Sequence, residues 1–217
     1  MKLRLASLSL LALALMLAAV PAASQVVYSN GPINGNTDAW SIEFGFIVSD
    51  TFNVANNGTT ITGFSFGAWL TPGGSLDYLE VSITSGENGG TSYFDEGLSN
   101  WTASGCVLNP YGYDVCKETT TFNGPTLDSG TYWVNLQDAN PIGNPVYWDE
   151  NSGPSSASEN SVGTIPSESF TVLGGASSSS TFDVTVTTGG TVPEPTNIML
   201  FGSGILSLIA AVRRRLM

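Results

Sequence analysis

Apolar side chains recur at every second position in several short stretches of this 217-residue chain. In an extended strand, alternate side chains point to the same face, so this period indicates strands with one buried face. The stretches lie at residues 40–48, 64–70, 79–83, 132–136 and 182–186. Apart from the two ends of the chain, no stretch of useful length shows the period of a helix. The pattern therefore predicts a body built of strands.

Glycine, asparagine and proline separate these stretches, for example at 56–58, 72–74 and 87–90. Glycine and asparagine tolerate positive φ and proline restricts φ, so these segments indicate tight turns. Several short strands joined by such turns favour antiparallel pairing. The sequence predicts an all-β fold, an antiparallel β-sandwich of jelly-roll-like type.

Residues 1–24 have the features of a secretory signal peptide. Lys2 and Arg4 flank the start of an apolar run at 5–20, and small residues follow at 22–24. We expect cleavage after Ser24; the alternative is a permanent N-terminal anchor. Cleavage leaves residues 25–191 as the body, which is long enough for one secreted domain with a sizeable core.

The C-terminal segment 192–217 opens with a short proline-containing motif, Val192, Pro193, Glu194 and Pro195. Its two prolines fix φ and lack N–H donors, so we expect an extended, unpaired segment. The uncharged stretch 196–212 follows and is 17 residues long, at the short end of what a membrane helix needs. Three basic residues then form a membrane stop that should hold the C-terminus in the cytoplasm: Arg213, Arg214 and Arg215. The alternative, a core helix with a solvated basic end, fits this uniform apolarity poorly.

The order of motif, apolar span and basic cluster resembles the PEP-CTERM sorting signal of Gram-negative bacteria. The resemblance is specific and covers residues 192–217 only. It implies that exosortase, a membrane cysteine transpeptidase, recognises the tail and cleaves it. It also implies an exported body in the cell envelope or outside the cell, with the C-terminal helix in the inner membrane before processing. Short runs at 132–135, 145–153 and 165–170 are similar to the bodies of other PEP-CTERM proteins, for which no activity is assigned.

Charge is distributed unevenly along the chain. Of the six basic residues, only Lys117 lies in the body, which holds every acidic residue except Glu194. Such a surface repels phosphate backbones and excludes nucleic-acid binding. The same surface could attract divalent cations, or its carboxylates could simply be solvated.

Cys106 and Cys116 are the only two cysteines. In an exported protein, two cysteines at this spacing are expected to form a disulfide that closes the intervening loop. A metal site is the weaker interpretation, because the chain has no histidine and no further cysteine to complete a tetrahedral set.

Few residues are suited to catalysis. The absence of histidine excludes a Ser-His-Asp triad and a histidine general base. The adjacent residues Asp149 and Glu150 would point to opposite faces of a strand, which makes them a poor acid/base pair. In a turn they could share a calcium ion with Asn151, or form only a polar turn after a strand. We therefore expect no enzymatic activity, a carboxylate glycosidase being the least favoured hypothesis.

Aromatic residues suggest a second kind of site. Sugar rings pack against exposed aromatic faces, so aromatic residues in loop-like contexts are candidates for sugar binding. They are Trp101, Tyr111, Tyr113 and Trp148. Trp40 and Trp69 fall within alternating stretches and are expected in the core or on a strand face.

Two functional hypotheses follow. The first is an exported structural or interaction protein of the envelope or extracellular matrix, processed through its C-terminal signal. The second is a carbohydrate-binding module for extracellular polysaccharide, with or without the assistance of calcium. The expected partners are exosortase, the membrane before processing and, for the second hypothesis, exopolysaccharide.

Overall fold

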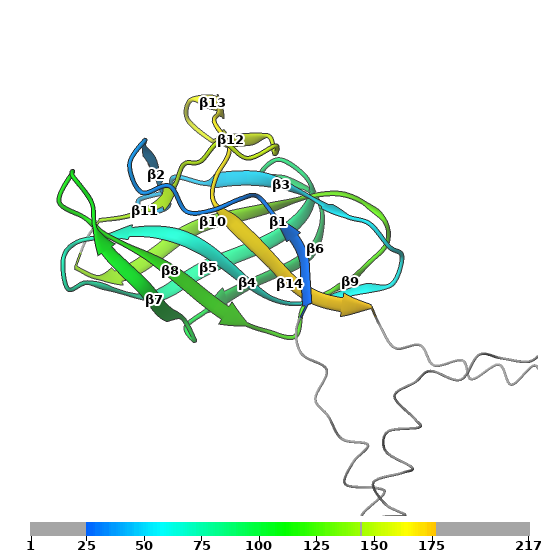
Figure 1. Ribbon diagram of the computed structural model, residues 1–217. Coiled ribbons are helices and arrows are strands. Elements are labelled where there is room, and N and C mark those ends of the chain that lie inside the picture. The colour runs from blue at the N-terminus through cyan, green and yellow to red at the C-terminus, as the bar shows by residue number, and fades with distance from the viewer. Residues whose placement is uncertain (1–24, 144, 177–217) are drawn as a thin grey trace, which may run out of the picture. The chain divides into compact units, whose positions relative to one another are not determined.

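A computed structural model describes residues 25–143 and 145–176, which form two antiparallel β-sheets and no helix (Figure 1). The predicted all-β, antiparallel class is confirmed. No helix of these residues is long and apolar enough to cross a membrane. The predicted signal peptide 1–24, sorting motif 192–195, membrane segment 196–212 and membrane stop 213–215 lie outside the described residues.

The larger sheet has eight strands. Their bounds are β1 Gln25–Ser29, β2 Ala39–Ser41, β4 Thr59–Leu70, β7 Thr102–Leu108, β8 Asp114–Thr121, β9 Thr126–Leu127, β11 Val146–Asp149 and β14 Phe170–Ala176. The long strand β4 is central, because β14 and β11 pair along one edge and β8 and β9 along the other. Beyond these neighbours, β1 pairs with β14, β2 with β11 and β7 with β8.

The smaller sheet has six strands in the order β13-β12-β3-β10-β5-β6. Their bounds are β3 Val48–Val54, β5 Ser75–Gly86, β6 Gly89–Leu98, β10 Gly130–Ile142, β12 Ala157–Glu159 and β13 Gly163–Ile165. Tight turns at the predicted glycine-rich positions join β3 to β4, β4 to β5 and β5 to β6. The turn at 87–90 uses positive φ at Asn88 and Gly90, as the turn residues predict.

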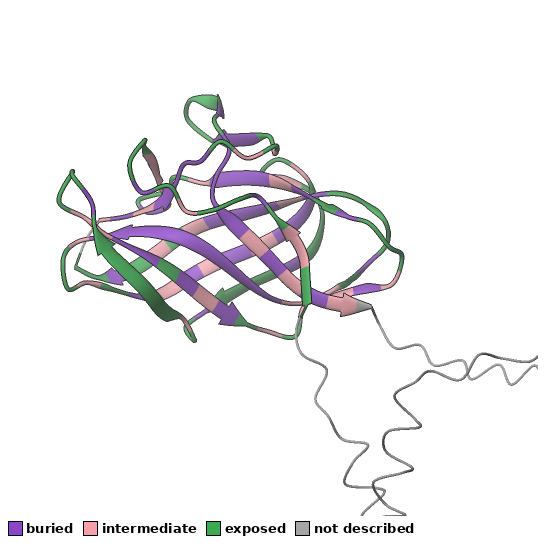
Figure 2. Ribbon diagram, in the orientation of Figure 1, coloured by how far each residue is buried: buried purple, intermediate pink, exposed green. Residues whose placement is uncertain are grey.

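One continuous core contains side chains from both sheets, the arrangement of a sandwich (Figure 2). The predicted alternations at 64–70, 79–83 and 132–136 supply much of it, and their inward-facing members are buried. Trp148 of β11 is fully buried and contacts three phenylalanine rings at centroid distances of 5.7 to 6.1 Å, Phe64, Phe66 and Phe170. Tyr28 and Phe52 link β1 to β3 across the core, with ring centroids 6.5 Å apart.

The alternation at 40–48 predicts a single strand, and this prediction is wrong. β2 ends and β3 begins within this stretch, with a tight turn between them. Phe44 and Gly45 both have positive φ, and the N–H of Phe46 donates to the carbonyl of Glu43 at 3.0 Å. The turn leaves Phe44 76% exposed, so its apolar side chain is not part of the core.

The outer face of β4 is covered by other segments of the chain. A Cβ atom on Gly67 would lie 2.5 Å from Ser169 Oγ, 2.8 Å from Asp149 Cβ and 3.0 Å from Ile33 Cγ1. These neighbours come from three segments far apart in the sequence. The missing side chain at Gly67 therefore lets all three segments pack directly on the strand.

We predict that Gly67→Ala destabilises the protein by about 1–3 kcal/mol, because the added methyl group overlaps Asp149 and Ser169. Chemical denaturation of the full chain measures the change. Gly175→Ala on β14 is the matched control, since a Cβ there meets nothing within 4 Å. Equal stability of the two variants would contradict the packing described for β4.

Candidate functional site

A buried carboxylate holds the loop after β1 against the larger sheet. Asp149 is fully buried at the end of β11. Its Oδ1 accepts hydrogen bonds from the N–H of Gly35 and from Trp69 Nε1, each at 2.7 Å, and its Oδ2 accepts the N–H of Asn34 at 2.8 Å. Three N–H donors satisfy this carboxylate without a metal ion or a basic side chain. The loop 33–36 is therefore fixed above β4 and β8.

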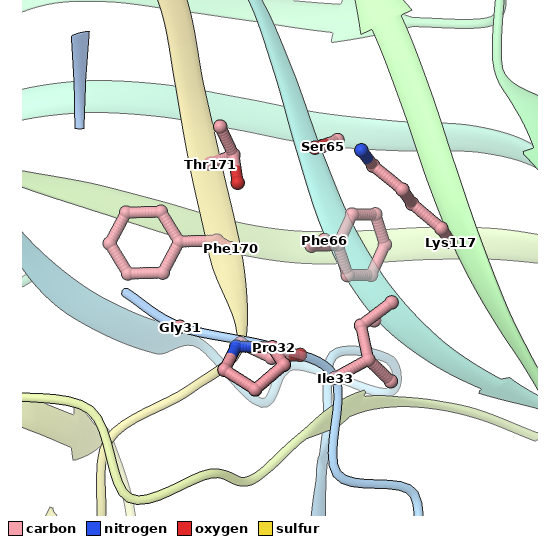
Figure 3. A pocket seen from close by; sticks show the side chains of 10 residues that line it. Gly31, Pro32, Ile33, Ser65, Phe66, Lys117, Phe170 and Thr171 are labelled. Carbon is pink, nitrogen blue, oxygen red and sulfur yellow. The ribbon is translucent and has the colours of Figure 1, made fainter. Parts of the chain in front are cut away.

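A groove runs between this loop and the strands beneath it. It consists of a smaller cavity of about 190 Å³ and a larger one of about 430 Å³, and Ile33 and Lys117 line both. The smaller cavity is further lined by Pro32, Ser65, Ser169 and Thr171, among others (Figure 3). The larger cavity lies against Asn34, Asn36, Ser104, Leu108 and Asn109, among others. Amide, hydroxyl and apolar groups thus share the lining.

An aromatic cluster lies next to Asn36 and Asn109, two residues that line the larger cavity. Tyr111 stacks on Trp69, with ring centroids 5.6 Å apart and an interplanar angle of 20°. Tyr113 also contacts Trp69, at 5.9 Å, and meets Tyr147 edge-on at 5.6 Å. Trp69 is buried, whereas Tyr111 is 59% exposed and donates its hydroxyl proton to the carbonyl of Asn36 at 3.2 Å. One aromatic ring is therefore presented to solvent beside the groove.

The hairpin of β7 and β8 forms the opposite wall of the larger cavity. A disulfide joins Cys106 to Cys116 across this hairpin, which confirms the predicted bond. The β7 strand is irregular next to it, where Gly105 has positive φ and the pairing with β8 shifts register. Val107 and Leu108 are mostly exposed along this wall. The disulfide thus fixes the spacing of the two strands from which they project.

The structure brings together two of the four predicted sugar-binding aromatics, Tyr111 and Tyr113. Trp101 packs edge-on against Phe66 at 5.5 Å and donates its indole N–H to the carbonyl of Leu98, so it covers the edge of the core. Trp148 is the clearest correction, because it lies in β11 with no exposed surface, and stacking needs an open ring face. The prediction for Trp69 is confirmed, since this residue is buried on a strand face.

Two of the three proposed calcium ligands, Asp149 and Asn151, use their side-chain oxygens in internal hydrogen bonds. The oxygens of Asp149 accept three N–H groups, and Asn151 Oδ1 accepts the N–H of Gly153 at 2.9 Å and the hydroxyl of Ser167 at 3.0 Å. Glu150 lies apart from Asp149, beside Trp40 Nε1 at 3.4 Å. Among the described residues, no three His, Cys, Asp or Glu side chains are arranged to hold a metal ion. The internal hydrogen bonds of Asp149 and Asn151 fit the alternative of a polar turn after the strand, and calcium binding stays a prediction.

A second set of carboxylates is buried without basic partners. The N–H of Glu168 donates to Asp50 Oδ2 at 2.8 Å, and Asn30 Nδ2 donates to the carbonyl of Glu168 at 2.6 Å. Both side-chain oxygens of Glu168 are buried without a hydrogen-bond partner. Burial, followed by the charges of Asp50 and Glu150, raises the pKa of Glu168 well above its usual value. The buried environment therefore favours the neutral form of Glu168.

Two other buried carboxyl groups have pKa values that are raised to between about 6 and 7. Burial raises the pKa of Asp50 to about 6, against the hydrogen bond from the N–H of Glu168, which lowers it. Burial also raises the pKa of Glu118 on β8 to about 7. Within the described residues, Lys117 is the only lysine or arginine that could compensate such charges, and its side chain lies outside the core.

Comparisons of the chain with models of protein families, with curated proteins and with solved structures find no match. The functional interpretation therefore rests on the geometry of the groove and on the sequence.

We predict that the protein is more stable at pH 5 than at pH 8, by about 1–3 kcal/mol. The folded-state pKa values of Asp50 and Glu118 lie above the unfolded values, so their stabilising contribution is complete below about pH 4 and is lost as pH rises through 6 to 7. Urea denaturation at a series of pH values measures the slope.

Glu118→Gln should flatten this slope between pH 6 and 8, because glutamine has the same shape and does not titrate. Glu96→Gln, at an exposed position of β6, is the control and should leave the slope unchanged. A stability that rises from pH 5 to pH 8 in the unmodified chain would contradict the assignment of neutral buried acids.

Proposed function

We propose that the chain is an exported interaction protein of the cell envelope or extracellular matrix, and that its β-domain binds an extracellular polysaccharide in the groove. The observation that carries this proposal is a groove lined by asparagine and serine residues, with the exposed Tyr111 hydrogen-bonded to two of them, Asn36 and Asn109. An aromatic face packs on the apolar side of a sugar ring, while neutral amides and hydroxyls hydrogen-bond sugar hydroxyls.

A binding role fits the groove better than a catalytic one. Carboxylate glycosidases need two acidic groups on either side of the bond that is cleaved. Neither cavity of the groove is lined by an acidic residue among those that the structure describes. The nearest carboxylate, Asp149, holds the loop through three hydrogen bonds and has no free oxygen to offer. We therefore propose a non-catalytic domain that needs no calcium.

The two ends of the chain support the proposed location. A signal peptide at 1–24 would deliver the body across the inner membrane. The C-terminal segment 192–217 would then hold it there through the helix 196–212, until exosortase acts at the motif 192–195. This part of the proposal rests on the sequence resemblance. The jelly-roll-like character of the sandwich is likewise proposed from the pattern of short strands and turns.

The first test concerns the aromatic ring. Tyr111→Ala should weaken the binding of a recognised polysaccharide roughly three- to tenfold, because an aromatic contact contributes about 0.5–1.5 kcal/mol beyond its buried area. A glycan array identifies the ligand, and calorimetry with the full chain measures the affinity.

Tyr93→Ala is the matched control, since Tyr93 is also partly exposed, at 41%, and packs against another aromatic ring, that of Tyr132, but it lies on β6 of the other sheet. Its affinity should equal that of the unmodified chain. If the array shows no glycan signal, or if both variants lose affinity equally, the groove is not the binding site.

The second test concerns sorting. In a host with exosortase, we expect mass spectrometry to find the delivered body without the apolar segment 196–212. Replacing both Pro193 and Pro195 with alanine should leave the chain uncleaved in the membrane fraction, because the extended motif is lost. Replacing Pro72 and Pro110 instead is the control, which should be processed normally. Equal cleavage of both double variants would remove the sorting motif from the proposal.

A further inference from the structure

Lys117 is an isolated positive charge in an acidic domain. Of the 18 acidic residues of the chain, only Asp183 and Glu194 lie outside the described residues, whereas Lys117 is the one basic residue within them. The strand partners of Lys117 are Gly67 on β4 and Ser104 on β7, neither of which carries a charge. Its neighbour Glu118 is buried on the other face of β8. The ammonium group therefore has no carboxylate partner in the described part of the chain.

This charge lies where the two cavities of the groove meet. Lys117 lines both of them, together with Ile33. In Figure 3 the side chain extends along the smaller cavity with its amine end toward Ser65, and Thr171 lies on the neighbouring strand. Ser169 also lines this cavity, and its hydroxyl is buried without a hydrogen-bond partner. Pro32 and Ile33 supply an apolar wall opposite these polar groups.

The smaller cavity is suited to bind an anion next to hydroxyl groups and an apolar surface. One ammonium group can pair with one carboxylate, and the serine and threonine hydroxyls can both donate to and accept from sugar hydroxyls. We infer that the groove recognises an acidic polysaccharide, with the carboxylate of a uronic acid residue bound by Lys117 and the neighbouring sugar beside Tyr111. This inference rests on the proposed function and names its substrate class.

The negative charge of the domain does not prevent this interaction. Repulsion between solvent-exposed charges is largely screened beyond about 8 Å at physiological ionic strength. An ion pair inside a partly enclosed groove is screened less and acts at contact distance. Lys117 is therefore the group of the groove that distinguishes a carboxylated sugar from a neutral one.

The test compares each acidic sugar with its own neutral form. Oligomers of galacturonic, glucuronic and mannuronic acid, and the methyl ester of each, are titrated into the full chain in 150 mM salt by calorimetry. The unmodified chain should bind at least one free acid about fivefold or more tightly than its methyl ester. Lys117→Gln should abolish this preference without changing the melting temperature, because the side chain is exposed, and Lys117→Arg should keep it.

Equal affinity for acid and ester, or a preference that survives in Lys117→Gln, would overturn the assignment to Lys117 while leaving polysaccharide binding intact. If the unmodified chain bound none of the oligomers and no neutral glycan, the proposed function would be overturned as well. Acetate and inorganic sulfate are added as competitors at the same concentration as the oligomer. Competition as strong as that of the oligomer would show a general anion site and overturn saccharide recognition.

Discussion

Three N–H groups converge on the carboxylate of Asp149, and the groove depends on this interaction. Two of them are successive backbone amides, those of Asn34 and Gly35, and the third is the indole of Trp69. Charge-assisted hydrogen bonds of this kind are among the strongest in proteins, and Asp149 has no exposed surface through which water could compete. Because Asp149 follows the buried Trp148, the same short strand contributes to the core on one face and to the groove on the other. Replacing Asp149 with a residue that has no carboxylate would remove the hydrogen bonds that hold both the loop 33–36 and Trp69 in place.

Some buried carboxyl groups of the domain have oxygens that accept no hydrogen bond. Asp149 accepts three N–H groups. The side chain of Glu168 accepts none, and Glu118 has one buried oxygen without a hydrogen-bond partner. A buried carboxylate without a partner costs several kcal/mol as an ion, so protonation is the less costly state. Asp149 accepts three N–H groups, whereas burial without donors favours the neutral form of Glu168.

The sequence predicts the sheets better than the site. A strand is indicated by residues that are close together in the sequence, whereas the site is formed by residues that are far apart in it. Alternation works at 64–70 and 132–136, because the apolar side chains at alternate positions of both strands face the core and the period is local. It fails at 40–48, where a turn with positive φ at Phe44 keeps the same apolar period. Trp148 is misplaced because the polar run after it resembles a loop, although these polar groups are buried and hydrogen-bonded.

Tyr111 and Tyr113 can be identified as candidates from aromatic residues beside turn signals. The groove itself cannot, since Asp149, whose hydrogen bonds hold segment 33–36 in place, is more than 110 residues away along the chain. Lys117 is visible in the sequence as the lone basic residue of the body. Its role depends on lying opposite Gly67, which only the strand register reveals.

Two different kinds of bond fix the positions of the two walls of the groove. The Cys106–Cys116 disulfide spans one wall, and the hydrogen bonds to Asp149 hold the other. A ligand that enters between them orders little of the protein, so less of its interaction energy is spent on loop entropy. A flexible polysaccharide loses considerable freedom on binding and gains most from such a fixed site. The fixed walls of the groove are thus the property that the proposed polysaccharide contact needs.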